Sequence, residues 1–174
     1  MSSMFKPNKY YKSIFDVNFE LLHQEGIKLI ACDLDNTLVP HDVADASLEV
    51  IELINKVKLL GFEIIVMSNN HKSRVERFCK PLDIKYYYSS KKPLKTTFKK
   101  ALRDFKVTNA EFCLIGDQIM TDVFGASRMK VMSVFVEPLA KKDIVYTKVN
   151  RIMENIIIKR LEKKNLFKRG EYYE

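Results

Sequence analysis

The stretch Leu29–Leu38 reads LIACDLDNTL and joins a short apolar run to a cluster of polar residues. Residues 27–33 have the brevity and apolar character of a parallel strand that is buried on both faces. Two carboxylates, Asp33 and Asp35, stand at the end of this run. Because ligands of open parallel sheets bind beyond the carboxyl ends of the strands, we expect a functional site here.

Short apolar runs of the same kind recur downstream, at residues 62–68, 84–88, 111–116 and 131–136. Amphipathic patterns typical of helices lie between them, at residues 46–60, 73–80, 93–105 and about 120–130. In the first helix we expect a buried stripe of Leu48, Ile51, Ile54 and Leu59, and in the third a stripe that begins at Leu94. This alternation predicts an α/β fold with a parallel five-stranded sheet flanked by helices.

The fourth apolar run also leads into carboxylates, because Asp117 follows Gly116 and Asp122 comes shortly after. If the first and fourth strands are neighbours, these two aspartates meet Asp33 and Asp35 at one edge of the sheet. Carboxylates at close range repel one another, and a hard divalent cation relieves that repulsion. We therefore predict a Mg²⁺ site formed by Asp33, Asp35, Asp117 and Asp122.

The order of the motifs resembles that of haloacid dehalogenase (HAD)-like phosphatases. Asp33-Leu34-Asp35-Asn36-Thr37 matches their DxDxT signature, Ser68 ends the second strand, Lys92 precedes Pro93, and Gly116-Asp117-x4-Asp122 follows the fourth strand. The segments Ser68-Asn69-Asn70, Lys92-Pro93-Leu94 and Gly116-Asp117-Gln118-x2-Thr121-Asp122-x2-Gly125 resemble the YqeG-type branch, which includes phosphatidylglycerophosphate phosphatases. The resemblance implies a HAD-like Rossmannoid fold without a cap domain.

Phosphoryl transfer needs a nucleophile, neutralised phosphoryl oxygens and a proton for the leaving oxygen. In this scheme Asp33 is the nucleophile and forms an aspartyl-phosphate. Asp35 protonates the leaving group and then activates water, and its backbone carbonyl reaches the metal by resemblance to the family. An acid at this second position is typical of the hydrolases. Asp117 completes the metal site, and Asp122 either binds through water, orients the lysine or caps the following helix.

Lys92 is the predicted catalytic cation, with Lys91 and Lys95 as rivals that one sequence does not separate. Ser68 and Thr37 are expected to bind the phosphoryl oxygens. We assign Asn69 to substrate binding as well. An alternative interpretation is that Ser68 and Asn69 only cap the helix that follows them.

The gaps between the motifs exclude an inserted cap. Only 30 residues separate Thr37 from Ser68, and 23 separate Ser68 from Lys92. Each gap is already filled by a predicted helix and strand. A site without a cap stays open, which favours a macromolecule or a lipid that covers the site itself.

The composition fits a single domain over residues 1–174, with a catalytic core at about 27–136. Its 174 residues are 47% apolar. The three cysteines are far apart and form no CxxC pair, and no apolar run is long enough for a signal peptide or a membrane span. We expect a cytoplasmic protein, peripheral on the inner face of the membrane if its basic flanks bind lipid.

The net charge of +8 is uneven, with twelve basic and three acidic residues between His71 and Lys106. Near the start, Tyr10, Tyr11 and Ile14 alternate with lysines. A basic amphipathic helix is expected at about 144–167, with an apolar side of Val145, Val149, Ile152, Ile156 and Leu161. Such segments suit an anionic membrane surface, although the helix stripe equally suits packing on the sheet.

The sequence thus predicts a Mg²⁺-dependent phosphomonoesterase, with phosphatidylglycerophosphate as the preferred substrate. Two alternatives stay open. One is a phosphatase of soluble or polynucleotide phosphates. The other is an RNA- or ribosome-binding protein with a vestigial site, which the basic stretch of residues 91–106 supports and the intact set of catalytic residues opposes.

Overall fold

A computed structural model describes residues 2–140 and 145–174. Its sheet has six strands in the order β1-β6-β5-β2-β3-β4, and every neighbouring pair is parallel. The strands are β1 (Lys9–Tyr11), β2 (Leu29–Cys32), β3 (Glu63–Met67), β4 (Lys85–Tyr87), β5 (Phe112–Gly116) and β6 (Met132–Val136). The last five match the predicted strands, and β2 and β5 are neighbours as expected.

The prediction of five strands is wrong by one, because β1 was not expected. This strand has only three residues and pairs with β6 at the edge of the sheet. Three residues carry too little periodicity to be recognised in a sequence. Tyr10 and Tyr11, which we expected to face a membrane, are 0% and 6% exposed, so they belong to the core instead.

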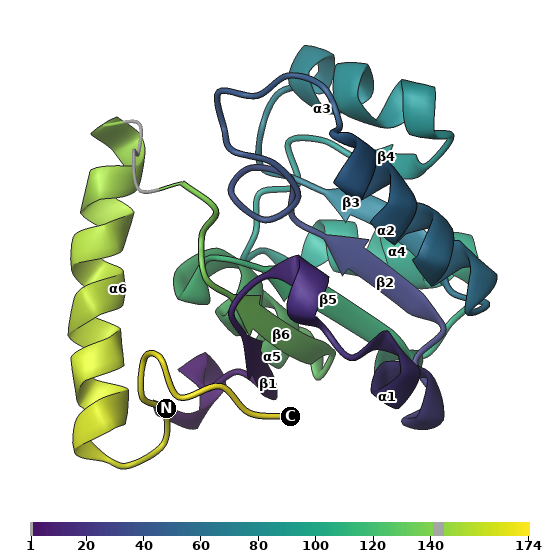
Figure 1. Ribbon diagram of the computed structural model, residues 1–174. Coiled ribbons are helices and arrows are strands. Elements are labelled where there is room, and N and C mark those ends of the chain that lie inside the picture. Colours follow the sequence, from purple (N-terminus) through teal and green to yellow (C-terminus); the bar gives the residue numbers. More distant parts are fainter. Residues whose placement is uncertain (1, 141–144) are drawn as a thin grey trace.

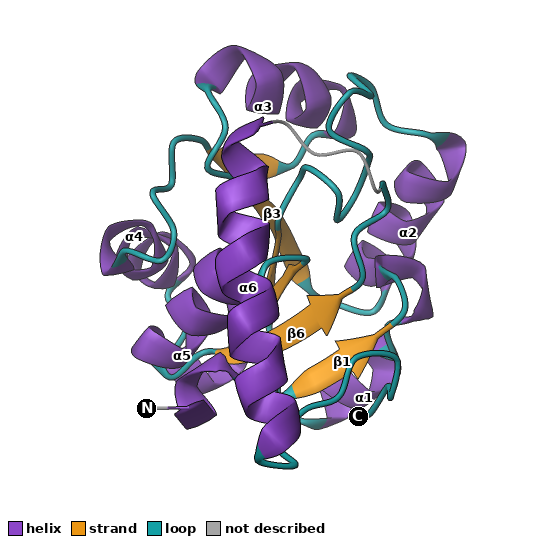
Figure 2. Ribbon diagram, turned by 90° about the vertical axis from the view of Figure 1, so that its left-hand side faces the viewer, coloured by secondary structure: helices purple, strands orange, loops and turns teal. Residues whose placement is uncertain are grey.

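Helices cover both faces of the sheet, as Figures 1 and 2 show. One face carries α1 (Phe19–Gln24), α2 (Leu48–Leu59) and α3 (Lys72–Cys79), and the other carries α4 (Lys95–Phe105) and α5 (Phe124–Met129). Alternate residues of each strand point to opposite faces. Ile30 and Cys32 of β2 therefore pack toward α2, whereas Leu29 and Ala31 pack toward α4.

The buried face of α2 differs from the predicted stripe. Leu48 and Leu59 are 78% and 88% exposed, and the buried residues are Val50, Leu53, Ile54 and Val57. These four recur at the helical period, whereas the two leucines lie at the helix ends, beyond the reach of the sheet. Leu94 is likewise exposed, because α4 begins only at Lys95.

The C-terminal helix α6 (Val145–Lys163) lies outside the α/β sandwich, along its β1–β6 edge (Figure 2). Its inner side buries Ile158 and Leu161 against Ile119 and Val123, in a cluster that also contains Tyr10, Phe135 and Phe167. The predicted stripe is wrong in part, since Ile152 and Ile156 are exposed. The side chains of Val145 and Val149 lie outside the described residues.

After α6 the chain returns to the edge strand β1. The backbone amide and carbonyl of Tyr10 exchange hydrogen bonds with those of Tyr173, at 2.8 and 2.9 Å. Between Thr37 and Lys92 the chain forms α2, β3, α3, a 3-10 turn, β4 and the segments that connect them, so no cap domain is inserted there. The described helices include none with the length and hydropathy needed to cross a bilayer.

Candidate active site

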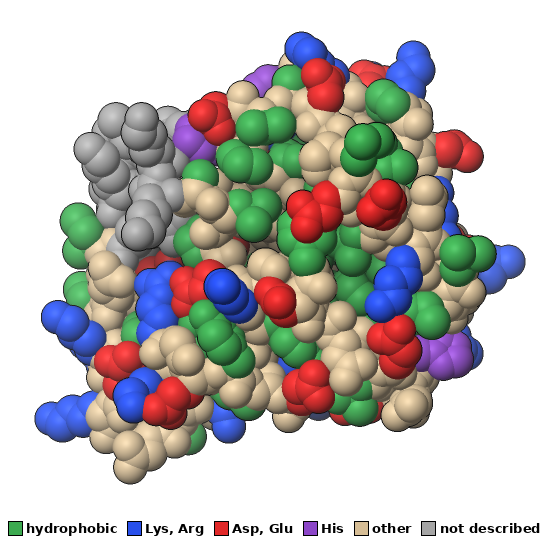
Figure 3. All heavy atoms as spheres, in the orientation of Figure 1, with side chains coloured by type: hydrophobic (Ala, Val, Ile, Leu, Met, Phe, Trp, Pro, Cys, Tyr) green, Lys and Arg blue, Asp and Glu red, His purple; other side chains and the backbone are tan. Residues whose placement is uncertain are grey.

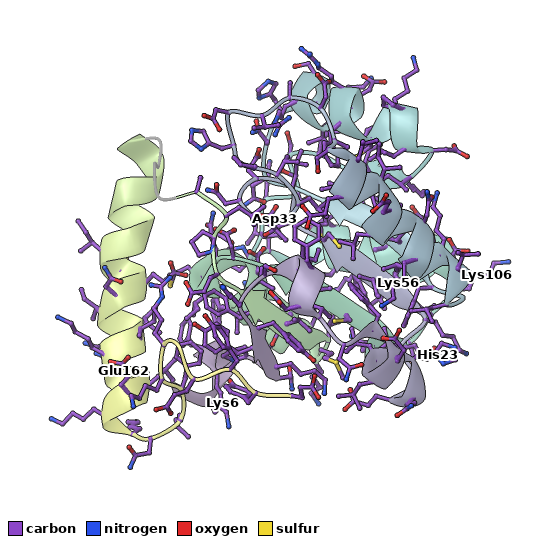
Figure 4. The ribbon with its side chains drawn as sticks, in the orientation of Figure 1. Lys6, His23, Asp33, Lys56, Lys106 and Glu162 are labelled. Atoms are coloured by element: carbon purple, nitrogen blue, oxygen red, sulfur yellow. The ribbon has the colours of Figure 1, made fainter. Side chains whose placement is uncertain are left out.

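The site begins at the carboxyl end of β2, where the chain leaves the sheet. Cys32 pairs with Ile115 of β5, and the amide of Asp33 donates to the Ile115 carbonyl at 2.8 Å. The following turn places Asn36 at a φ of 64°, in the left-handed region that asparagine tolerates. Asp33 is therefore held by the two central strands, and Figure 4 shows it near the middle of the view, whereas Lys106 lies at the right-hand margin.

Lys92 is the lysine that enters the site. Its Nζ lies 2.9 Å from Asp33 Oδ1 and 2.7 Å from Asp122 Oδ1, and its side chain is 1% exposed. Lys91 and Lys95 are both exposed, which settles the choice that the sequence left open.

Asn69 holds the loop that carries this lysine. Its Oδ1 accepts from the Lys92 amide at 2.7 Å, and its Nδ2 donates to the Lys92 carbonyl at 3.1 Å. The neighbouring side chain of Asn70 turns instead to Asp35. Asn69 thus contacts the backbone of a site residue, and its assignment to substrate binding stays a prediction.

Three buried carboxylates meet at the edge where β2 and β5 end. Asp33, Asp117 and Asp122 each offer an oxygen, and these oxygens lie within 4.8 Å of one another. Asp122 is seated against Gly116, where an added Cβ would lie 2.3 Å from Asp122 Oδ2. The same Oδ2 accepts from the Gln118 amide at 3.1 Å. Asp122 lies within the π-helical turn η5 (Ile119–Val123) and does not cap α5.

The charges of this cluster fit a divalent cation. Three carboxylates and the single ammonium of Lys92 leave a formal charge of −2 in a buried site. Burial, opposed by Lys92 and reinforced by Asp122, raises the pKa of Asp33 to about 7. Burial alone would lower the pKa of Lys92, but Asp122 and Asp33 outweigh it and raise that pKa. Carboxylates in this arrangement are the ligands that Mg²⁺ takes in proteins.

The carboxylate of Asp35 lies outside that group of three and is held by other partners. Its Oδ1 accepts from Arg74 Nε and Nη2 at 3.2 and 3.0 Å, and its Oδ2 accepts from Asn70 Nδ2 at 3.0 Å. Arg74 also donates from Nη1 to the Ala44 carbonyl at 3.0 Å. The side chains of Asp35 and Arg74 are 20% and 11% exposed, so this ion pair is largely shielded from water.

Two hydroxyls complete the candidate site. Thr37 is fully buried, and its Oγ1 has no hydrogen-bond partner among the described residues. Ser68 is 2% exposed at the end of β3, and its Oγ accepts from the Asn70 amide at 3.1 Å. A buried hydroxyl without a partner is costly, so Thr37 fits a site that receives a polar ligand.

A doubly wound parallel sheet with a buried aspartate, lysine and acidic cluster at its carboxyl edge is an arrangement that suits phosphoryl transfer. Residues 41–130 match the family profile of haloacid dehalogenase-like hydrolases. The chain is also 35% identical, over 94% of its length and 95% of the relative's, to the "Probable phosphatase YqeG" of Bacillus subtilis. The chain belongs to the haloacid dehalogenase-like hydrolases and is a phosphatase of that family.

A more distant relative and a solved structure complete the comparison. The chain is 25% identical to the "Phosphatidylglycerophosphate phosphatase 1, chloroplastic/mitochondrial" of Arabidopsis thaliana, over 92% of the chain but 49% of that relative. The fold is similar to that of the cobalt-bound deoxy-D-mannose-octulosonate 8-phosphate phosphatase of Haemophilus influenzae, with a TM-score of 0.52, 17% identity and coverage of 82% and 94% of the two chains.

Sequence reasoning missed two parts of this site. Arg74 contacts Asp35 from the third position of α3, and nothing in the local sequence distinguishes it from an exposed helix arginine such as Arg77. Glu154 of α6 accepts a hydrogen bond from the amide of Ile119, which lies in the same turn as Asp122. A glutamate within an apolar helix face was the signal that could have found the second residue.

Proposed function

We propose that the chain is a Mg²⁺-dependent phosphomonoester hydrolase that works through an aspartyl-phosphate on Asp33. The observation that carries this proposal is the pairing of Asp33 with Lys92, beside Asp117 and Asp122, at the end of β2. A nucleophilic carboxylate needs a cation beside it, because it must approach an anionic phosphate.

The proposed mechanism has two steps. An Asp33 oxygen attacks phosphorus, and the bond from phosphorus to the ester oxygen breaks. Asp35 gives its proton to that leaving oxygen and then takes a proton from the water that cleaves the aspartyl-phosphate. Lys92 neutralises the charge of the phosphoryl group, and Thr37 and Ser68 donate hydrogen bonds to the phosphoryl oxygens. When bound by Asp33, Asp117 and Asp122, together with the Asp35 carbonyl, Mg²⁺ would supply further charge neutralisation.

We further propose that the substrate is a lipid phosphate, phosphatidylglycerophosphate. The name of the Arabidopsis relative supports this substrate, and so does a site without a cap. The outer face of α6 adds a third argument. Ile152, Met153 and Ile156 are 62%, 49% and 47% exposed there. Exposed Lys159, Arg160 and Lys163 follow along the helix, and Figure 3 shows the hydrophobic and basic side chains at this edge.

This arrangement suits an anionic lipid surface at the cytoplasmic face, because apolar side chains enter the interface while lysines contact headgroups. Not every basic residue of the C-terminal segment is available for that role. Arg169 pairs with Glu137 at 2.7 Å, and Lys168 pairs with Glu171. The proposed membrane face is therefore the outer side of α6 and not the whole basic segment.

The catalytic proposal is tested with Asp33→Asn and with a chromogenic phosphate monoester. We expect this variant to lose turnover while it keeps its fold by circular dichroism. Wild-type activity should vanish in EDTA and return with Mg²⁺. Asp42→Asn, an exposed neighbour in the same loop, is the control and should retain activity. Near-wild-type turnover by Asp33→Asn would exclude the aspartyl-phosphate.

The substrate proposal is tested with a panel of lipid, nucleotide and sugar phosphates. We expect phosphatidylglycerophosphate in mixed vesicles to be the best substrate, and vesicle binding to weaken as salt rises. Ile152→Asn with Ile156→Asn should reduce vesicle binding and lipid hydrolysis but spare the soluble substrate. Leu59→Asn, at an exposed leucine of α2, is the matched control. Efficient cleavage of a soluble phosphate alone, or tight RNA binding without any cleavage, would favour the alternative functions.

A further inference from the structure

Glu154 is an acidic residue on the buried side of α6. It is 4% exposed, while its neighbours Met153 and Asn155 face outward. The residues that continue its face of the helix, Ile158 and Leu161, are apolar and buried. Burying a carboxylate is costly unless it receives hydrogen bonds, so an acid at this position needs a specific partner.

Its partner is the turn that supports the acidic cluster. Glu154 Oε1 accepts a hydrogen bond from the Ile119 amide at 2.5 Å. Ile119 is the first residue of η5, and this turn follows Asp117 and contains Asp122. The first amides of a helical segment have no partner within the segment and attract carboxylates. Here Asp122 takes the amide of Gln118 and Glu154 takes the next one.

We propose that Glu154 is a positioning residue for the acidic cluster, acting through the backbone of residues 117–122. The inference rests on the proposed function, since it assigns a role in the site formed by Asp33, Asp117 and Asp122. On one side the turn is held by the seating of Asp122 against Gly116. On the other side it is held by the hydrogen bond from the Ile119 amide to Glu154. The C-terminal helix is thus part of the support of the active site.

The test compares Glu154→Ala with Glu154→Gln. In the alanine variant the amide of Ile119 loses its acceptor, so the turn is free to shift. We call the Mg²⁺ concentration that gives half-maximal thermal stabilisation, measured without substrate, the Mg²⁺ midpoint. We expect this midpoint to rise by about 10–100-fold and kcat to fall. Glutamine keeps an acceptor oxygen at the same distance along the side chain, so Glu154→Gln should stay close to the wild type in both measurements.

Ile158→Ala is the control for a purely structural role, because it removes packing on the same face of α6 without touching the hydrogen bond. It should lower the melting temperature and leave the Mg²⁺ midpoint unchanged. If Glu154→Ala does not fold, Glu154→Asp, with a carboxylate one methylene shorter, provides the same comparison.

Two results would overturn this proposal and leave the proposed function standing. One is a wild-type Mg²⁺ midpoint and kcat in Glu154→Ala, and the other is an equal midpoint shift in Ile158→Ala. Both results presuppose a wild-type protein that cleaves phosphate and is stabilised by Mg²⁺. A wild-type protein that does neither would overturn the proposed function, and this inference with it.

Discussion

At the scale of single residues, the site depends on opposite charges that are buried together. Lys92 contacts two of the three clustered carboxylates, and Arg74 with Asn70 holds Asp35 apart from them. The two aspartates of the DxDxT motif therefore have different partners, which fits their different proposed roles. Asp33 lies beside an ammonium and two carboxylates, whereas Asp35 lies beside a guanidinium and an amide.

Replacing Lys92 should damage both catalysis and stability. In Lys92→Met the buried carboxylates lose their cation, and removing one partner of a buried ion pair costs about 3–5 kcal/mol. The free energy of unfolding, measured by urea titration in EDTA, should fall by that amount, and kcat should fall by about 10²–10³-fold. Lys91→Met and Lys95→Met, at exposed positions, should change neither quantity. Equal effects at all three positions would contradict the assignment.

Replacing Arg74 should affect turnover through Asp35. In Arg74→Ala the Asp35 carboxylate loses the two N–H donors that hold its Oδ1, and with them its orientation, so kcat should fall by about tenfold or more, as for other residues that orient a catalytic group. Arg74→Lys should restore little, because an ammonium lacks the planar fork. The Mg²⁺ midpoint should not move, since Asp35 offers no side-chain oxygen to the cluster of three. Lys72→Ala, exposed on the same helix, is the control.

Gly116 should not tolerate a side chain. In Gly116→Ala the new Cβ would lie 2.3 Å from Asp122 Oδ2 and 2.4 Å from Asp122 Cγ, so the carboxylate must leave its position. A misplacement of about 1 Å in a catalytic group can cost about 10²-fold in rate, and we expect a loss of kcat of that order. Gly26→Ala, strained by its φ of +84° but without a contact within 4 Å, should lose stability and keep its kcat.

At the scale of elements, the central strands and the helices that cover them shield the three cysteine thiols from water. Cys32 and Cys113 lie in the neighbouring strands β2 and β5, and Cys79 ends α3. All three thiols are buried. Burial raises the pKa of Cys32 and of Cys79 to about 12, and it raises that of Cys113 as well.

These thiols should therefore be inert in the native protein. A raised pKa means that the reactive thiolate is absent until the pH approaches the pKa itself, so increasing the pH from 7 to 9 should not open a reaction with Ellman's reagent. In denaturant all three cysteines should react, with a pH dependence centred near the ordinary thiol pKa of about 8.5. Rapid labelling of the native protein at pH 8 would contradict the burial of these strands and of α3.

At the scale of the whole molecule, the two ends of the chain stabilise one another at the β1 edge. The C-terminal segment pairs with Tyr10 through the backbone of Tyr173, and the ring of Phe167 lies 5.0 Å from that of Tyr10 and 5.9 Å from that of Phe135. An unpaired edge strand exposes hydrogen-bonding groups, and this contact covers them. The segment after α6 therefore covers the outer edge of β1 at Tyr10.

Removing the Phe167 ring should destabilise the whole protein. Phe167 is 4% exposed, and truncation of a buried phenylalanine costs about 3–5 kcal/mol. We expect Phe167→Ala to lower the free energy of unfolding by that amount in a single cooperative transition. Leu59→Ala, at a leucine that is 88% exposed, should change it little. A normal free energy of unfolding in Phe167→Ala would show that the C-terminal segment does not support the sheet.

By itself the sequence determined the parallel strands β2 to β6, the helices between them and the acidic edge. These features depend on short-range periodicity and on motifs whose residues stand close together in the chain. Burial of Lys92 instead of Lys91 or Lys95 was decided only by the tertiary structure, because three lysines near one proline have the same local pattern. The same holds for β1, for the buried side of α6, and for the contacts of Arg74 and Glu154. Each of these depends on a partner far away in the sequence, and local periodicity contains no information about which distant surface a side chain meets.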